Sequence, residues 1–312
     1  MKRYDLIDTK VCEAGEGKPG RIVVYINPDE AEKKSLIDDY KLDEHTLNST
    51  FDPDEISRLE FEPDHVAMIF KRPKNYSSKD HFMFKVASLG LYLFQDRLIV
   101  LLNDDIQMFS GKTFARCASL LDVSLRLIAW VIFHFMEHLK VINMITDSLE
   151  HKINTSMENK HLLNLFTLEK SLVYYLAAIN SNMMLINKIK NSAAKLGMTP
   201  ENGELLDDIL IENTQCMRQA EIYSNILASM MDARASIISN NINVLMKTLN
   251  IITIGIMVPT LVVSIFSMNV LLPLNKDHPA MFWVIISLCI ASTVAFFAFW
   301  KRRSDRQFHA RG

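Results

Sequence analysis

Cysteines are few in this sequence and lie far apart. The four of them, Cys12, Cys117, Cys216 and Cys289, form no Cys-x-x-Cys pair, so neither a disulfide framework nor a cysteine zinc site is indicated. The N-terminus also lacks the apolar core of a signal peptide, because its longest apolar run is only Ile22–Ile26. We therefore expect the large N-terminal portion to stay in a reducing compartment.

Charge is missing from two long stretches near the C-terminus. No charged residue occurs from Thr248 to Asn275, and none occurs from His278 to Trp300. About 20 apolar residues cross a hydrocarbon core roughly 30 Å thick, and buried core helices are rarely this long without charge. We therefore expect two membrane spans, 249–268 and 279–300, joined by the short external loop 269–278.

The acidic residues concentrate before these spans. Residues 1–248 have 28 Lys and Arg against 34 Asp and Glu, a net charge of −6, while residues 249–312 have 6 against 2, a net charge of +4. This acidity argues against nucleic acid as a partner. Lys247 precedes the first span and the basic tail 301–312 follows the second, so the positive-inside rule places both termini in the cytoplasm.

The sequence before the spans predicts an α/β domain over residues 1–110 and a helical region over 111–203. Strands are expected at 21–26, 66–70, 84–94 and 98–102, and short helices at 29–40 and 54–58. One face of the first helix in the helical region is expected to carry Leu120, Ser124, Leu127, Val131, Phe135 and Leu139.

A single long helix is expected to connect the soluble part to the membrane. Residues 204–258 contain no proline and one glycine, Gly255, which predicts a stalk roughly 80 Å long that continues into the first span as one element, 204–268. An apolar stripe follows the stalk and needs another helix to pack on. Its members are Cys216, Ala220, Tyr223, Leu227, Met231, Ala235, Ile238, Ile242, Leu245, Leu249 and Ile252.

A second stripe on this helix is polar or methionine throughout. Its spacing alternates between three and four residues, a repeat that keeps one face toward the axis of a left-handed bundle. Such a face suits a water-filled axis, although small polar residues also line dry helix contacts. Two spans cannot enclose a pore alone, so a conduit requires several subunits. The stripe consists of Asn243, Met246, Asn250, Thr253, Met257, Thr260, Ser264 and Ser267.

The end of the first span carries a family resemblance. Phe266-Ser-Met-Asn269, followed by Val-Leu-Leu-Pro273, a short loop and a second span ending in Lys-Arg-Arg, resembles the CorA family of divalent-cation transporters, whose signature here is Gly-Met-Asn. Three stretches of the stalk also resemble the family: Ile222–Leu227, Ser239–Lys247 and Val258–Thr260. The resemblance covers the whole architecture.

This resemblance implies a funnel-shaped homopentamer in the plasma membrane, which in bacteria is the inner membrane, with the first span lining a channel for Mg²⁺ and possible Co²⁺ or Ni²⁺ entry. No enzymatic activity or organic cofactor is expected. Ser267, Met268 and Asn269 would form the outer mouth, where amide oxygens hold Mg²⁺ through its waters. Asn243 resembles the inner pore asparagine, while Met246, Leu249 and Met257 resemble the hydrophobic constriction.

One residue departs from the family pattern, because Ser267 replaces the glycine of the signature. A positive φ would be costly for serine, so the mouth could change shape. This departure leaves open a metal-sensing protein without conduction or with altered selectivity, as well as a zinc transporter of the same superfamily.

The family also implies closure by intracellular Mg²⁺ bound to carboxylates on the stalk. The candidate ligands are Asp207, Asp208, Glu212 and Asp232. A solvated charged face explains Asp207 and Glu212 equally well.

A competing motif lies in the helical region. His134-Phe-Met-Glu137-His138 matches the His-x-x-Glu-His pattern of zinc hydrolases, in which both histidines bind one metal. No third ligand is identifiable in the sequence, so we expect histidines that cap a helix or face solvent. A membrane zinc hydrolase is the third class of function that the sequence leaves open.

Overall fold

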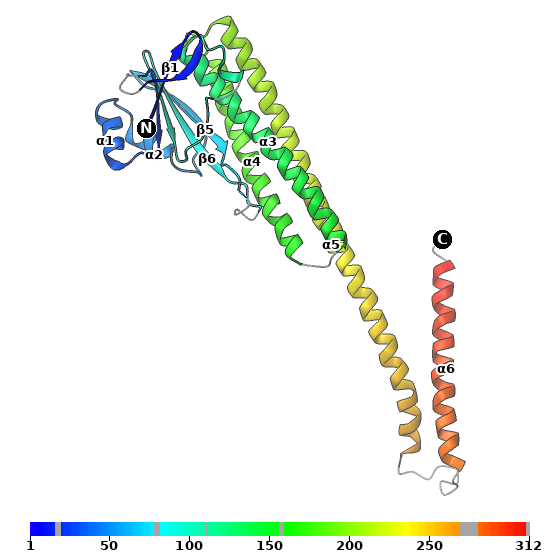
Figure 1. The fold of residues 1–312 in the computed structure, drawn as a ribbon. Helices are drawn as coiled ribbons and strands as arrows, with labels where there is room; N and C mark the ends of the chain where they lie inside the picture. Colours follow the sequence, from blue (N-terminus) through cyan, green and yellow to red (C-terminus); the bar gives the residue numbers. More distant parts are fainter. Residues whose placement is uncertain (16–19, 78–81, 110–111, 156–158, 269–279, 310–312) are drawn as a thin grey trace. The chain divides into compact units, whose positions relative to one another are not determined.

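The computed structural model describes residues 1–15, 20–77, 82–109, 112–155, 159–268 and 280–309 (Figure 1). The chain divides into two compact units, Met1–Met231 and Asp232–Gly312. The first unit contains a sheet and most of the helices. The second unit contains the C-terminal part of one long helix and the final helix.

The first unit is built on a seven-stranded mixed sheet with the order β2-β1-β3-β7-β6-β5-β4. β3 and β7 pair in parallel, and the other neighbours are antiparallel. The strands are β1 Lys2–Ile7, β2 Lys10–Glu13, β3 Ile22–Ile26, β4 Arg58–Phe61, β5 His65–Pro73, β6 Val86–Phe94 and β7 Leu98–Leu102. The α/β architecture predicted for this part of the chain is confirmed, and β1, β2 and β4 were not anticipated.

Two short helices, α1 (Glu30–Asp38) and α2 (Glu44–Ser49), form a small core with one face of the sheet. The helix predicted at 54–58 is wrong, because those residues form a turn that leads into β4. The Asp43 side chain caps α2 by accepting from the Thr46 amide, and Leu47 of α2 is buried. Ile56, the one apolar residue of the predicted helix, is 60% exposed, so burial does not stabilise a helix there.

The opposite face of the sheet packs against α3 (Leu120–Thr155) and α4 (Asn159–Asn191), after the short 3-10 helix η2 (Lys112–Phe114) (Figure 1). All six predicted face residues of α3 are buried, which confirms this face. By length and composition α4 could also cross a membrane. Its buried stripe nevertheless packs into the main core with the sheet and α3.

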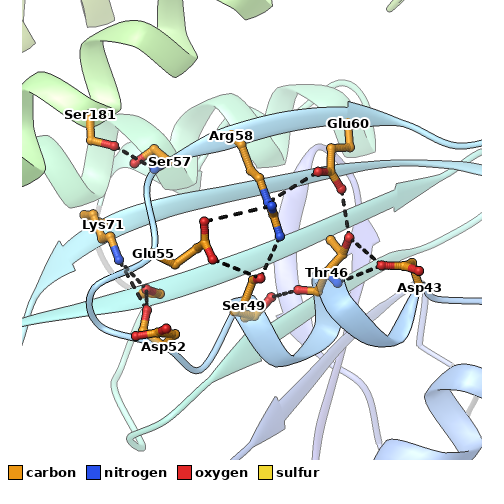
Figure 2. A network of polar contacts seen from close by, with 12 residues as sticks. Asp43, Thr46, Ser49, Asp52, Glu55, Ser57, Arg58, Glu60, Lys71 and Ser181 are labelled. Atoms are coloured by element: carbon orange, nitrogen blue, oxygen red, sulfur yellow. Dashed lines mark hydrogen bonds and ion pairs between the residues drawn. The ribbon is translucent and has the colours of Figure 1, made fainter.

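Polar contacts tie α4 to the sheet, and Figure 2 shows one of them, in which the Ser57 backbone N–H donates to the Ser181 hydroxyl at 2.6 Å. The Asn182 amide accepts from the Lys71 backbone N–H and the Ser57 hydroxyl and donates to the Lys71 carbonyl, each at 2.8 Å. The Lys71 ammonium donates to the carbonyls of Asp52 and Pro53, and burial lowers its pKa. Because these groups lie away from water, the two hydrogen bonds between Asn182 and the Lys71 backbone hold α4 in one register on β5.

The long helix α5 (Pro200–Phe266) has 67 residues, a length of about 100 Å, and belongs to both units. It begins four residues before the predicted start, because Pro200 suits the first helical turn. In the first unit its predicted apolar stripe packs into the core, where Cys216, Ala220 and Leu227 are buried.

The second unit pairs the remainder of α5 with the antiparallel helix α6 (Ala280–His309). Both helices are long and apolar enough to cross a membrane. The loop predicted at 269–278 lies outside the described residues.

Candidate functional site

The polar stripe of α5 lies on the face that α6 leaves open. All eight stripe members are exposed, from Asn243 to Ser267. On the other side of α5, a row of residues is wholly or partly covered, namely Ile251, Gly255, Val258, Pro259, Val262 and Phe266. α6 therefore covers one side of the helix only.

Two contacts fix this side. A Cβ added to Gly255 would lie 3.1 Å from the Phe297 ring, and the Cys289 thiol donates to the Pro259 carbonyl at 3.7 Å. Gly255 is nine positions from both Met246 and Ser264, which is two and a half helical turns at 3.6 residues per turn. From Thr253 to Ser264 the stripe and the contact with α6 thus lie on opposite sides of α5, whereas Asn243, Met246 and Asn250 line a cleft that α6 also lines.

Three of the four hydroxyls on the stripe donate their hydrogens within the helix. Thr253 donates to the Leu249 carbonyl at 2.9 Å, Thr260 donates to the Ile256 carbonyl at 2.7 Å, and Ser267 donates to the Ser264 carbonyl at 3.0 Å. A hydroxyl that has donated its hydrogen presents only oxygen lone pairs outward. The face therefore offers acceptors to a cation or to its water shell.

The apolar members of this face are equally accessible. Met246, Leu249 and Met257 are 54%, 58% and 62% exposed. Three apolar rings would alternate with polar ones if several copies of α5 faced a common axis. A narrow apolar ring can close a water-filled path by losing its water.

Ser267 does not need the conformation that only glycine adopts easily. It is not among the described residues with positive φ, and its N–H donates to the carbonyls of Val263 and Ser264. The backbone strain expected for serine at this position is therefore absent. Asn269 lies outside the described residues, and Met268 is exposed.

The four candidate regulatory carboxylates are all exposed. Asp207 forms an ion pair with Lys190 of α4 at 2.6 Å, which gives it a structural partner within the chain. Asp208 and Glu212 are four residues apart and share one side of α5. Within the described ranges, no three His, Cys, Asp or Glu residues gather into a group that could hold a metal.

The histidines of the zinc-hydrolase pattern do not face solvent, so that expectation was wrong. His138 is 9% exposed, and its Nδ1 lies 2.7 Å from the Tyr175 hydroxyl of α4. Burial lowers the pKa of both His134 and His138 to about 4. Glu137 is exposed, so it lies away from the pair it would have to serve.

Sequence reasoning missed the contact face on α5. A side chain at Gly255 would press against Phe297 of α6, and Gly255 is the one glycine between Glu204 and Val258. A lone glycine on the side of α5 opposite the polar stripe is the signal that would have shown where the second span packs on this helix.

The chain is similar to known proteins of one family along most of its length. The profile of a family described as "CorA-like Mg2+ transporter protein" matches residues 21–303. The Cobalt/magnesium transport protein CorA of Methanocaldococcus jannaschii is 25% identical over 271 residues, which are 82% of each chain.

Solved structures share the fold. The complete structure of the CorA magnesium transporter from M. jannaschii superposes with a TM-score of 0.78 at 21% identity over 96% of both chains. The full-length CmaX protein gives 0.71 at 14% identity over 97% of both chains. The ZntB cytoplasmic domain from Vibrio parahaemolyticus gives 0.56 at 12% identity, covering 77% of this chain and 98% of that domain.

Proposed function

The chain belongs to the CorA-like Mg²⁺ transporter family and is a membrane protein, and from this premise we propose that it conducts Mg²⁺ into the cell down the electrochemical gradient. Its family transports Mg²⁺ and Co²⁺, and we propose Mg²⁺ as the main cargo, with Co²⁺ or Ni²⁺ as further substrates. The observation that carries this proposal is the polar stripe of α5, which is exposed at every one of its members from Asn243 to Ser267.

Assembly follows from the same face. One copy of α5 cannot surround a path, so the conduit is a ring of subunits, and we take the pentamer as its size. The C-terminal part of the apolar stripe supports this assembly, because Ile242, Leu245 and Leu249 are more than half exposed in a single chain. A neighbouring α5 would cover them.

The proposed path has three parts. Ser267, Met268 and Asn269 form the outer mouth, where side-chain oxygens receive the hydrated ion. Thr253, Thr260 and Ser264 line the middle with oxygen acceptors, together with Asn243 and Asn250 nearer the cytoplasm. Met246, Leu249 and Met257 form the apolar constriction.

Regulation by intracellular Mg²⁺ is part of the proposal. Asp208, Glu212 and Asp232 carry exposed carboxylates, and Asp207 would have to leave Lys190 to join them. A ligand set completed by the next subunit would hold the closed state, with both termini in the cytoplasm and the protein in the plasma membrane.

Charged thiol reagents can test which face of α5 lines the path. The experiment measures Mg²⁺ entry into proteoliposomes with an internal Mg²⁺ dye, in a Cys12→Ser background because Cys12 is the exposed native cysteine. A cationic methanethiosulfonate should reduce entry to background in Thr253→Cys. Val258→Cys, on the covered side, is the matched control and should keep its flux.

Equal block of the two variants would show that the stripe is not the path. Absence of Mg²⁺ entry through the unmodified protein would contradict transport itself.

A further inference from the structure

The second unit contains a cleft between α5 and α6 that the ion pathway does not explain. Its volume is about 460 Å³. α6 contributes Phe296, Phe299 and Trp300 to its wall, and α5 contributes Lys247 together with apolar and amide side chains. The contacts at Gly255 and Pro259 hold the two helices together further along, so the cleft occupies one end of the pair.

This end of the pair is the boundary of the uncharged stretches. Lys247 is the last charged residue before the first stretch, and Trp300 is the last residue of the second, directly before Lys301 and Arg302. Tryptophan and lysine gather where hydrocarbon meets headgroups. The cleft therefore opens at the depth of lipid phosphates.

Its charge is of one sign. Among the described residues no carboxylate forms an ion pair with Lys247, and the sequence has a single acid, Asp277, between Asp232 and Asp305. Lys301 and Arg302, which follow Trp300 in the sequence, are exposed and do not line the cleft. A phosphate group would supply the missing negative partner.

The rest of the wall suits an acyl chain. Ile251 and Ile254 of α5 and Phe296 of α6 line the cleft, and Asn250 lies about one turn beyond Lys247. A headgroup beside Lys247 and Asn250 would direct its chain along this apolar wall. A small soluble anion would leave the apolar wall exposed.

We propose that this cleft binds one anionic phospholipid, with its phosphate on Lys247 and its acyl chain between α5 and α6. Asn243, Met246 and Asn250 line both the cleft and the polar stripe. A lipid bound in the cleft would therefore contact the first three members of the polar stripe. The binding proposal depends only on the two helices spanning a membrane, and it holds or fails independently of Mg²⁺ transport.

Tryptophan quenching by brominated lipid tests the site directly. The full-length protein carries Trp283→Phe, so that Trp300 is the only tryptophan of α6. It is reconstituted in phosphatidylcholine vesicles that contain either dibromo-phosphatidylglycerol or dibromo-phosphatidylcholine. We expect Trp300 to be quenched at about fivefold lower content of the anionic lipid, the effect of one interfacial lysine.

Two lysines at the same boundary separate a built site from diffuse attraction. Lys247→Gln should bring the ratio between the two lipids close to one, and Lys247→Arg should restore it. Lys301→Gln removes the same charge outside the cleft wall and should leave the preference nearly unchanged.

Three results would overturn the proposal. An equal loss in Lys247→Gln and Lys301→Gln would indicate diffuse electrostatic attraction. An unchanged preference in Lys247→Gln would remove the phosphate from this lysine. Failure of both brominated lipids to quench Trp300 would mean that protein, such as a second copy of the chain, fills the cleft.

Discussion

Single buried side chains give the first unit a dependence on pH. His134 and His138 lie between the sheet, α3 and α4, with Arg72 and Tyr175 among their neighbours. Burial lowers both pKa values from 6.5 to about 4, and the positive charge of Arg72 contributes to the lowered pKa of His134. The folded state thus holds both imidazoles neutral at pH 7.

The sign of the resulting effect follows from linkage. Between pH 6.5 and 4 the unfolded chain binds protons that the folded chain does not, so stability is full above about pH 6.5 and falls as the pH drops. For His138 the complete loss is about 3 kcal/mol. Urea unfolding of the purified protein, followed by fluorescence, should show this decline.

A variant isolates the contribution of one ring. His134 Nδ1 is buried without a hydrogen-bond partner, so His134→Phe should not destabilise the protein at pH 7 and should reduce its acid sensitivity by roughly half. His45→Gln, at an exposed position, is the control and should leave the pH profile as it was. An unchanged profile in His134→Phe would contradict the assignment.

The sequence could not place these histidines. They stand one position before Phe135 and Leu139, which the helical period correctly put on the buried face of α3. How wide a buried face becomes depends on how many elements cover it, and α3 is covered by both the sheet and α4. That width is a tertiary property that period alone does not reveal.

Elements were predicted best where their pattern was long. β7 was expected at Leu98–Leu102 and lies there, and the long helix was expected within a few residues of its bounds. β1 and β2 lie at one end of the sheet and contain no fully buried residue, so no run of apolar or alternating residues marks them in the sequence. Asp43 caps α2, whose Leu47 is buried, whereas the Asp54 backbone N–H donates to the Asp52 carboxylate in a turn next to the exposed Ile56.

The pairing of α5 with α6 depends on the missing side chain of Gly255. A valine there would push against the Phe297 ring, which already lies 3.1 Å from the place of a Cβ. Overpacking of this kind costs about 1–3 kcal/mol. Gly255→Val should therefore lower the melting temperature of the purified protein in detergent.

A smaller partner should relieve the clash. Phe297→Ala combined with Gly255→Val should recover much of the lost stability, because the two residues are in direct contact. Phe299→Ala, on the same helix but without this contact, is the control and should give no recovery. Additive losses in the double variant would show that α6 packs elsewhere.

At the scale of the whole molecule, an uncharged stripe determines what can drive transport. The chain has no ionisable residue on the stripe and none in the sequence between Lys247 and Lys276, so no relay couples ion movement to protons. For a divalent ion, an inside-negative potential of about 100 mV supplies roughly 4.6 kcal/mol. This supports an inward concentration ratio of about three decades without a pump.

Flux should therefore follow the membrane potential alone. In proteoliposomes with a potassium diffusion potential, Mg²⁺ entry should fall to the level set by its concentration gradient when valinomycin and equal potassium remove the potential. A pH gradient imposed at fixed potential should leave the rate unchanged, because the stripe offers oxygen acceptors and apolar rings with no group that titrates. Entry driven by the pH gradient alone would show that the ion path includes an ionisable group outside the stripe, and the passive mechanism would be wrong.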